Sequence, residues 1–137
     1  MRDVAVVIPA GGVGRRMGGR TPKQFLRIGR TTILALTVRQ FVRHPSVALV
    51  VVAAPPDYLA TTHRALARIT PTSRVLVVEG GAERQDSVYR GMQATRGDAA
   101  LIVVHDAVRP CITRALIDRV MAAARANGAA ICALPIA

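Results

Sequence analysis

The amino-acid sequence predicts an α/β fold, in which helices cover both faces of a mainly parallel sheet. Two observations lead to this prediction. Short apolar runs alternate with longer segments of helical periodicity along all 137 residues. The apolar runs are also continuous rather than alternating, so each strand is expected to be buried on both faces. Strands of this kind are typical of a parallel sheet whose crossovers are helices.

Five apolar runs rich in Val, Ile, Leu and Ala are predicted as strands. The first leads directly into a glycine-rich loop, and the last follows a helix-stop signal at Asn127-Gly128. The predicted strands are 4–8, 47–53, 74–78, 100–104 and 129–134.

Four helices are predicted between these strands. Thr31 or Thr32 can cap the first, Thr113 caps the fourth, and Gly128 stops the fourth. The first helix reaches about residue 43, the second runs from a turn at 55–57 to about 69, the third covers 85–94, and the fourth ends at 127. The alternation of strand and helix predicts a Rossmann-like sheet with right-handed crossovers.

The composition narrows the classes of partner. The net charge is +11, but the arginines are spread along the chain, aromatic residues make up 3%, and Trp is absent. Stacking platforms for nucleic acid are therefore scarce, and no nucleic-acid partner is expected.

No run is long enough to cross a membrane, and Asp3 interrupts the start of any leader peptide. Cys111 and Cys132 lack metal or disulfide spacing and are predicted to be buried free thiols. A cytoplasmic protein without a membrane partner is expected.

Three loops follow the carboxyl ends of predicted strands, where parallel sheets bind ligands. They are 9–23, 80–87 and 105–110. The first combines glycines with Arg15, Arg16 and Lys23, and Lys23 is the single lysine beside 18 arginines. Backbone N–H groups freed by glycine, together with fixed positive charge, predict a polyphosphate site.

Three phosphate-binding motifs compete for the first loop. The dinucleotide fingerprint fails because Met17 stands where its third glycine belongs. A Walker A reading over 14–21 keeps its glycines and Thr21, but places Arg20 where the lysine belongs. The third reading takes the loop as it stands, PAGGVGRRMGGRTPKQF, which resembles nucleotidyltransferases that join a nucleotide to a sugar or polyol phosphate.

The other two loops narrow this resemblance. GGAERQDSV at 80–88, HDAVRP at 105–110 and PKQFLRIG at 22–29 resemble the 2-C-methyl-D-erythritol 4-phosphate cytidylyltransferase family. Ribitol-phosphate cytidylyltransferases share the same plan, so the acceptor is less defined than the nucleotide. The resemblance implies that CMP passes from CTP to a polyol phosphate, with Mg²⁺ as the cofactor and pyrophosphate as the second product.

The resemblance also implies roles for individual residues. Arg16 and Lys23 match the pair that stabilises the transition state. Asp106 and Arg109 match residues that face the acceptor, and Asp106 is also the candidate Mg²⁺ ligand, directly or through water. Neither Glu83, Arg84 and Asp86 nor His105 is expected to be catalytic: the first three form a charge cluster at a helix start, and His105 is a packed neighbour. The implied nucleotide-binding residues are Pro9, Ala10, Gly11, Gly12, Gly80, Gly81, Ser87 and Ala107.

Members of that family continue beyond the position that matches residue 137. Residues 1–137 are therefore expected to form the nucleotide-binding portion of a nucleotidyltransferase domain, with the C-terminal end of the sheet missing. Full-length members are expected to form homodimers. A nucleotide-binding fragment without turnover is the alternative from a different functional class.

Overall fold

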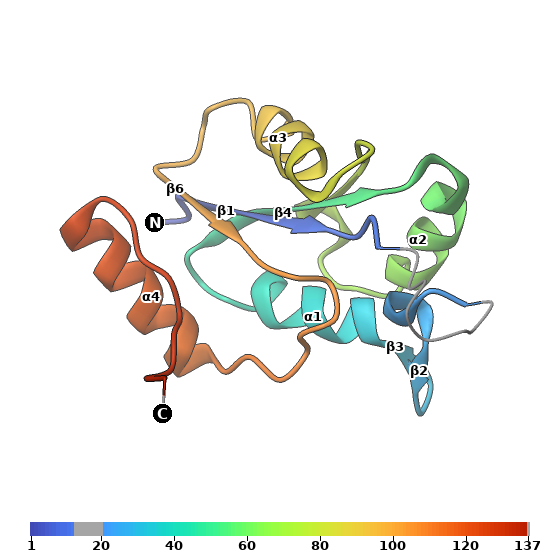
Figure 1. The fold of residues 1–137 in the computed structure, drawn as a ribbon, viewed down its shortest axis with the longest axis horizontal. Coiled ribbons are helices and arrows are strands. Elements are labelled where there is room, and N and C mark those ends of the chain that lie inside the picture. Colours follow the sequence, from blue (N-terminus) through green and yellow to red (C-terminus); the bar gives the residue numbers. More distant parts are fainter. Residues whose placement is uncertain (13–20, 137) are drawn as a thin grey trace.

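The computed structural model describes residues 1–12 and 21–136, and its centre is a four-stranded parallel sheet (Figure 1). The strand order is β5-β4-β1-β6, so the first strand in sequence lies inside the sheet. The α/β, Rossmann-like fold class is thereby confirmed. The strands are β1 (Val4–Pro9), β4 (Val47–Ala54), β5 (Val75–Glu79) and β6 (Leu101–Val104).

Helices lie on both faces of this sheet. Figure 1 shows α3 on one face and α1 on the other, with α2 and α4 toward opposite ends. The helices are α1 (Ile33–Val42), α2 (Leu59–Leu66), α3 (Arg84–Ala94) and α4 (Arg114–Asn127). Short 3-10 turns are η2 (Lys23–Phe25), η3 (Pro56–Tyr58) and η4 (Thr72–Arg74).

The continuous apolar run of β1 is explained by its position between two helices. All six residues of the strand are buried. Val4, Val6 and Ile8 belong to one core cluster with residues of α1 such as Phe41. Val7 points to the opposite face, where it meets Gly91 of α3. Alternate side chains therefore need apolar neighbours on both sides, as the sequence pattern predicts.

Capping residues lie at the helix termini where the sequence predicts them. Of the two candidate threonines, Thr32 caps α1, because its Oγ1 accepts a hydrogen bond from Ala35 N. Thr113 caps α4 by accepting from Leu116 N. Gly128 ends α4 with a φ of 85°, a conformation that favours glycine.

A short hairpin before α1 was not foreseen. β2 (Arg27–Ile28) and β3 (Thr31–Thr32) pair antiparallel, and Gly29 in the turn has a φ of 63°. Two-residue strands are too short to show an alternating pattern, so only the glycine indicates the turn.

The predicted fifth strand at 129–134 is wrong. This segment forms no strand, and the side chains of Ile131 and Leu134 are 87% and 89% exposed. An apolar run becomes a strand only beside a partner, and in the described part of the chain β6 pairs with β1 alone. The prediction that both cysteines are buried thiols is also wrong. Cys132 is exposed in this segment, and Cys111 is exposed in the loop before α4.

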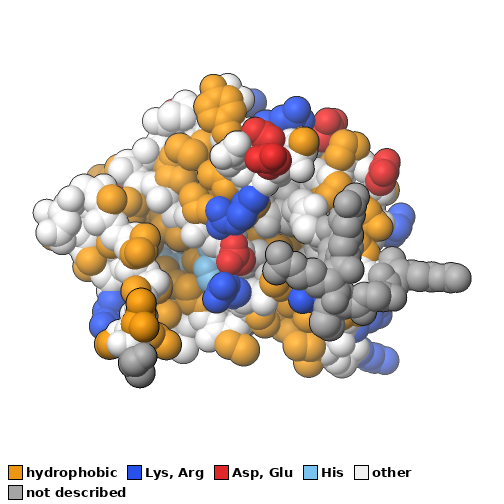
Figure 2. All heavy atoms as spheres, viewed as in Figure 1, with side chains coloured by type: hydrophobic (Ala, Val, Ile, Leu, Met, Phe, Trp, Pro, Cys, Tyr) orange, Lys and Arg blue, Asp and Glu red, His pale blue; other side chains and the backbone are white. Residues whose placement is uncertain are grey.

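An apolar hollow of about 750 Å³ lies between β6, α4 and residues 130–132. Figure 2 shows apolar side chains gathered along this side of the molecule. Helix α4 is joined to the body near both ends: Asp118 accepts a 2.8 Å hydrogen bond from Nε2 of the buried His44, and Arg125 Nη2 donates to Asp3 Oδ1 at 2.9 Å. Within the described ranges, no helix has the length and apolar character needed to cross a bilayer.

Candidate functional site

The three loops singled out from the sequence meet around one hollow of about 830 Å³. It lies beyond the carboxyl ends of the strands, where ligands bind in sheets of this kind. Gly80 is buried behind the lining, and Arg16 lies outside the described residues. The predicted residues that line the hollow are Pro9, Ala10, Gly11, Gly12, Lys23, Gly81, Ser87, Asp106, Ala107 and Arg109.

The glycine-rich loop is held at both of its described ends. Ala10 N donates to Ala53 O at 2.7 Å, which fixes the end of β1 against β4. Gln24, only 3% exposed, donates from Nε2 to Ala10 O at 2.9 Å and to Gly12 O at 3.0 Å. Because both carbonyl oxygens are bound by Gln24, the intervening backbone is held in one conformation beside the hollow.

Lys23 is positioned by a compact turn. Phe25 N donates to Pro22 O at 3.0 Å, and Leu26 N donates to Lys23 O at 3.1 Å. The Phe25 ring stacks on Tyr58 with 5.5 Å between centroids, which ties the turn to the start of α2. Lys23 is therefore held half-buried at the wall of the hollow, where its ammonium can meet an anion.

The second loop turns tightly over the start of α3. Gly81 N donates to Ser87 Oγ at 3.1 Å, and Ser87 is 1% exposed. A Cβ on Gly80 would lie 2.7 Å from Ser87 Oγ, and one on Gly81 would collide with the Cβ of Asp86. Glycine is thus required at both positions by close approach. A Cβ on Gly11 would lie 3.5 Å from the same Ser87 oxygen, so the first and second loops adjoin there.

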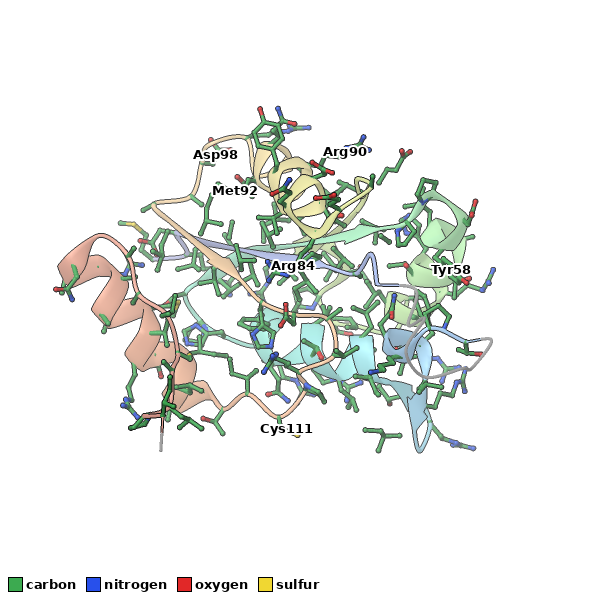
Figure 3. The ribbon with its side chains drawn as sticks, viewed as in Figure 1. Tyr58, Arg84, Arg90, Met92, Asp98 and Cys111 are labelled. Atoms are coloured by element: carbon green, nitrogen blue, oxygen red, sulfur yellow. The ribbon has the colours of Figure 1, made fainter. Side chains whose placement is uncertain are left out.

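The charge cluster at the start of α3 divides into two functions. Glu83 and Asp86 form a capping box, with Glu83 N donating to Asp86 Oδ2 at 3.0 Å. Their structural interpretation is confirmed. Arg84 is the first residue of α3, but its side chain reaches away from the helix: its Nη2 donates to Asp106 Oδ1 at 2.9 Å, and Figure 3 shows it between α3 and the chain that follows β6.

Asp106 links the second loop to the third. Its Oδ1 accepts from Arg84, and its Oδ2 accepts from Arg109 Nε at 2.9 Å. Figure 2 shows a carboxylate between two basic side chains in the middle of this face. The hydrogen bond from Arg84 lowers the pKa of Asp106 below its ordinary value of 3.8, against the opposing effect of partial burial, and the bond from Arg109 lowers it further.

The third loop is fixed on its buried side. Thr37 of α1 donates from Oγ1 to Ala107 O at 3.0 Å, and Ala107 is 6% exposed. The His105 ring packs edge-on against Phe41 and lies 3.0 Å from Arg109 O. His105 is therefore a packed neighbour, as the sequence predicts, and it braces the backbone that carries Arg109.

A Mg²⁺ site requires oxygen ligands, usually one or two carboxylates together with substrate phosphates and water. No three His, Cys, Asp or Glu side chains gather as a metal site among the described residues. Two carboxylates line the hollow: Glu83, whose side chain belongs to the capping box of α3, and Asp106, which lies beside Arg109. This arrangement therefore fits an ion that is shared with a bound nucleotide.

Sequence reasoning did not assign five residues that the structure places in the lining: Gln24, Ala82, Glu83, Arg84 and Val108. For Gln24 a signal was available, because it is the one uncharged polar residue between the buried Pro22 and Phe25. Arg84 gave no such signal: its partner Asp106 lies 22 positions away in sequence, and only the fold brings them together.

Comparison with known proteins identifies the family. The sequence model described as IspD, 2-C-methyl-D-erythritol 4-phosphate cytidylyltransferase, matches residues 4–137. The chain is 44% identical to the 2-C-methyl-D-erythritol 4-phosphate cytidylyltransferase of Symbiobacterium thermophilum, covering 97% of this chain and 55% of that protein. It is 38% identical to the bifunctional IspD/IspF enzyme of Desulfotalea psychrophila, covering 99% of this chain and 35% of that protein.

Solved structures agree in fold. The 4-diphosphocytidyl-2C-methyl-D-erythritol synthase of Anaerococcus prevotii superposes with a TM-score of 0.76 at 22% identity, covering 92% of this chain and 52% of that one. A second 4-diphosphocytidyl-2C-methyl-D-erythritol synthase structure superposes with a TM-score of 0.71 at 30% identity. The match covers 93% of this chain and 56% of that one. The chain therefore spans between about a third and a little over half of these relatives.

Proposed function

The chain belongs to the IspD family of 2-C-methyl-D-erythritol 4-phosphate cytidylyltransferases, and from that premise we propose that it transfers CMP from CTP to 2-C-methyl-D-erythritol 4-phosphate. The observation that carries the proposal is the hollow in which three separate loops bring together glycine backbone, Lys23, Asp106 and Arg109. No single loop would support it, since each also has a simpler structural interpretation.

In the proposed reaction, an oxygen of the acceptor phosphate attacks the α-phosphorus of CTP. The new P–O bond forms as the bond between the α-phosphorus and the bridging oxygen breaks, and pyrophosphate leaves with that electron pair. The nucleophile is already an anion, so no general base is needed. That no base is needed agrees with the position of His105, whose ring packs against Phe41 and lies against the Arg109 backbone.

The main work of the protein is then to position two anions and offset their repulsion. Lys23 and Arg16 are proposed to stabilise charge on the triphosphate as the bridging bond breaks. The backbone N–H groups of Gly11 and Gly12 are proposed to bind the nucleotide, with Gly81 in the wall beside it, and Arg109 is proposed to hold the acceptor phosphate through its guanidinium fork. A Mg²⁺ on the triphosphate, held by Asp106, would add positive charge at the same place.

The close fit of the second loop supports recognition of one base. Ser87 and Gly81 are buried or half-buried and already joined by a hydrogen bond, so the loop presents a fixed polar edge. A fixed edge discriminates between bases, because a mismatched base leaves buried polar groups without partners.

Pyrophosphate release tests the proposal. Release should require CTP, Mg²⁺ and 2-C-methyl-D-erythritol 4-phosphate together, and should fall about 100-fold or more in Lys23→Ala. Arg43→Ala, which removes an exposed arginine outside the hollow, should leave the rate unchanged. Release with CTP alone would contradict the transfer reaction, and release only with ribitol 5-phosphate would contradict the proposed acceptor.

A further inference from the structure

A second hollow lies apart from the candidate site, between the β2–β3 hairpin and helices α1 and α2. Figure 1 shows the hairpin and α2 toward one end of the molecule, with α1 extending from there to the centre. The hollow has a volume of about 320 Å³ and shares no lining residue with the nucleotide site. Five arginines line it: Arg27 and Arg30 on the hairpin, Arg39 on α1, and Arg64 and Arg68 in or just after α2.

These five arginines have no carboxylate partner among the described residues, unlike the five described arginines that form ion pairs. Other described arginines also lack such a partner, but they lie outside this hollow: Arg2, Arg43, Arg74, Arg96 and Arg119. Each of Arg84, Arg90, Arg109, Arg114 and Arg125 lies within 4 Å of an acidic oxygen. Among the described residues, no ion pair includes any of the five around the second hollow. An anion that enters the hollow would therefore reduce the repulsion among these positive charges.

The remaining lining suits phosphate oxygens. Thr31 and Thr32 bring two hydroxyl groups, and Thr32 Oγ1 already accepts from Ala35 N, which leaves its O–H to donate. Among the described residues that line the hollow there is no aromatic side chain. Guanidinium groups bind phosphate through paired, charge-assisted hydrogen bonds.

We propose that this hollow binds a compact polyanion that carries two or more linked phosphate groups. Its small volume favours a short phosphate chain over an extended polymer. Free pyrophosphate and the triphosphate tail of a nucleotide share this chemistry. The proposal is independent of the reaction at the other site.

Amide NMR spectra test the proposal, because they report each hollow separately. At 150 mM salt, inorganic pyrophosphate should give saturable shifts at the amides of Thr31, Ala35 and Ala65. ATP should shift the same amides and adenosine should not, since the phosphate chain is the ligand. Shifts produced by adenosine, or shifts that grow without saturating, would overturn the proposal.

Paired variants separate a built site from general charge. Arg39→Gln with Arg68→Gln should weaken pyrophosphate binding at these amides about tenfold or more, since two charge-assisted contacts are lost. Arg43→Gln with Arg119→Gln removes the same charge from exposed positions outside the hollow and should change binding less than about twofold. Equal weakening in both pairs would overturn the proposal. The amide signals of Gly11, Gly12 and Gly81 report on the nucleotide hollow. A loss of binding at that hollow can therefore be told apart from a loss at the arginine-lined one.

Discussion

At the scale of single residues, Gln24 explains how a loop rich in glycine keeps a defined shape. One amide nitrogen supplies hydrogen bonds to the carbonyl oxygens of Ala10 and Gly12. The same residue follows Lys23 in sequence, so the support of the glycine loop and the position of the cation are set by one short turn. Buried carbonyl groups that lose a donor cost about 1–3 kcal/mol.

Gln24→Met should therefore weaken CTP binding about tenfold, because it keeps the length of the side chain but removes both hydrogen bonds. Gln40→Met makes the same change at an exposed position of α1 and should have no effect. Calorimetric titration with CTP and thermal unfolding should be measured together. A fall in Tm with unchanged CTP affinity would show that Gln24 supports the fold but not the site.

Asp106 gives the site a defined pH dependence. Because its pKa is lowered in the folded state, its ion pairs contribute stability above the ordinary value of 3.8. This contribution is lost as the pH falls through the lower, folded-state pKa. The side chain is 37% exposed, so the effect should stay within about 1 kcal/mol.

Wild type should consequently be more stable than Asp106→Asn at pH 6, and this difference should shrink toward pH 3. Asp98→Asn is the matched control, because Asp98 is exposed and belongs to no ion pair in the described structure. Thermal unfolding across this pH range checks the prediction. A difference that is the same at both pH values would contradict the assigned ion pairs.

At the scale of elements, the candidate site depends on how closely α3 approaches β1. Gly91 is buried on α3, and a Cβ there would collide with Cγ1 of Val7. The first turn of the same helix contains Arg84 and Ser87, which both line the nucleotide hollow. Helix–sheet packing thereby sets the distance between the second loop and the glycine-rich loop.

Gly91→Ala should destabilise the protein by about 1–3 kcal/mol through overpacking, although alanine is the better helix former. Combining it with Val7→Ala should give a smaller loss than the sum of the two single changes, since the second change makes room for the first. Unfolding in urea gives all three values. Strictly additive losses would show that the two residues do not meet.

Sequence patterns predicted those elements whose cause is local. Continuous apolar runs marked β1 and β4, and Thr32 and Thr113 marked helix starts. Features that depend on distant partners were not predictable in this way. The Arg84–Asp106 bond joins α3 to the loop after β6, and the expected strand at 129–134 lacks a neighbour to pair with. Local propensity alone decides neither.

At the scale of the whole molecule, the carboxyl edge of the sheet gathers the residues proposed to bind the nucleotide, while the arginine-lined hollow lies apart from it. Part of the net charge of +11 therefore lies in the two hollows, and the rest is distributed along the chain. The lining of the nucleotide hollow comes from the loops after β1, β5 and β6, and each of these strands is fixed by parallel pairing within the same sheet. The central claim is that this edge recognises CTP.

Equilibrium binding of CTP against ATP, with Mg²⁺ and a sample shown to be folded, tests that claim most directly. The account predicts selective CTP binding that is lost in Lys23→Ala and in Arg16→Ala and kept in Arg43→Ala. Equal affinity for the two nucleotides, or no binding by the folded protein, would contradict it.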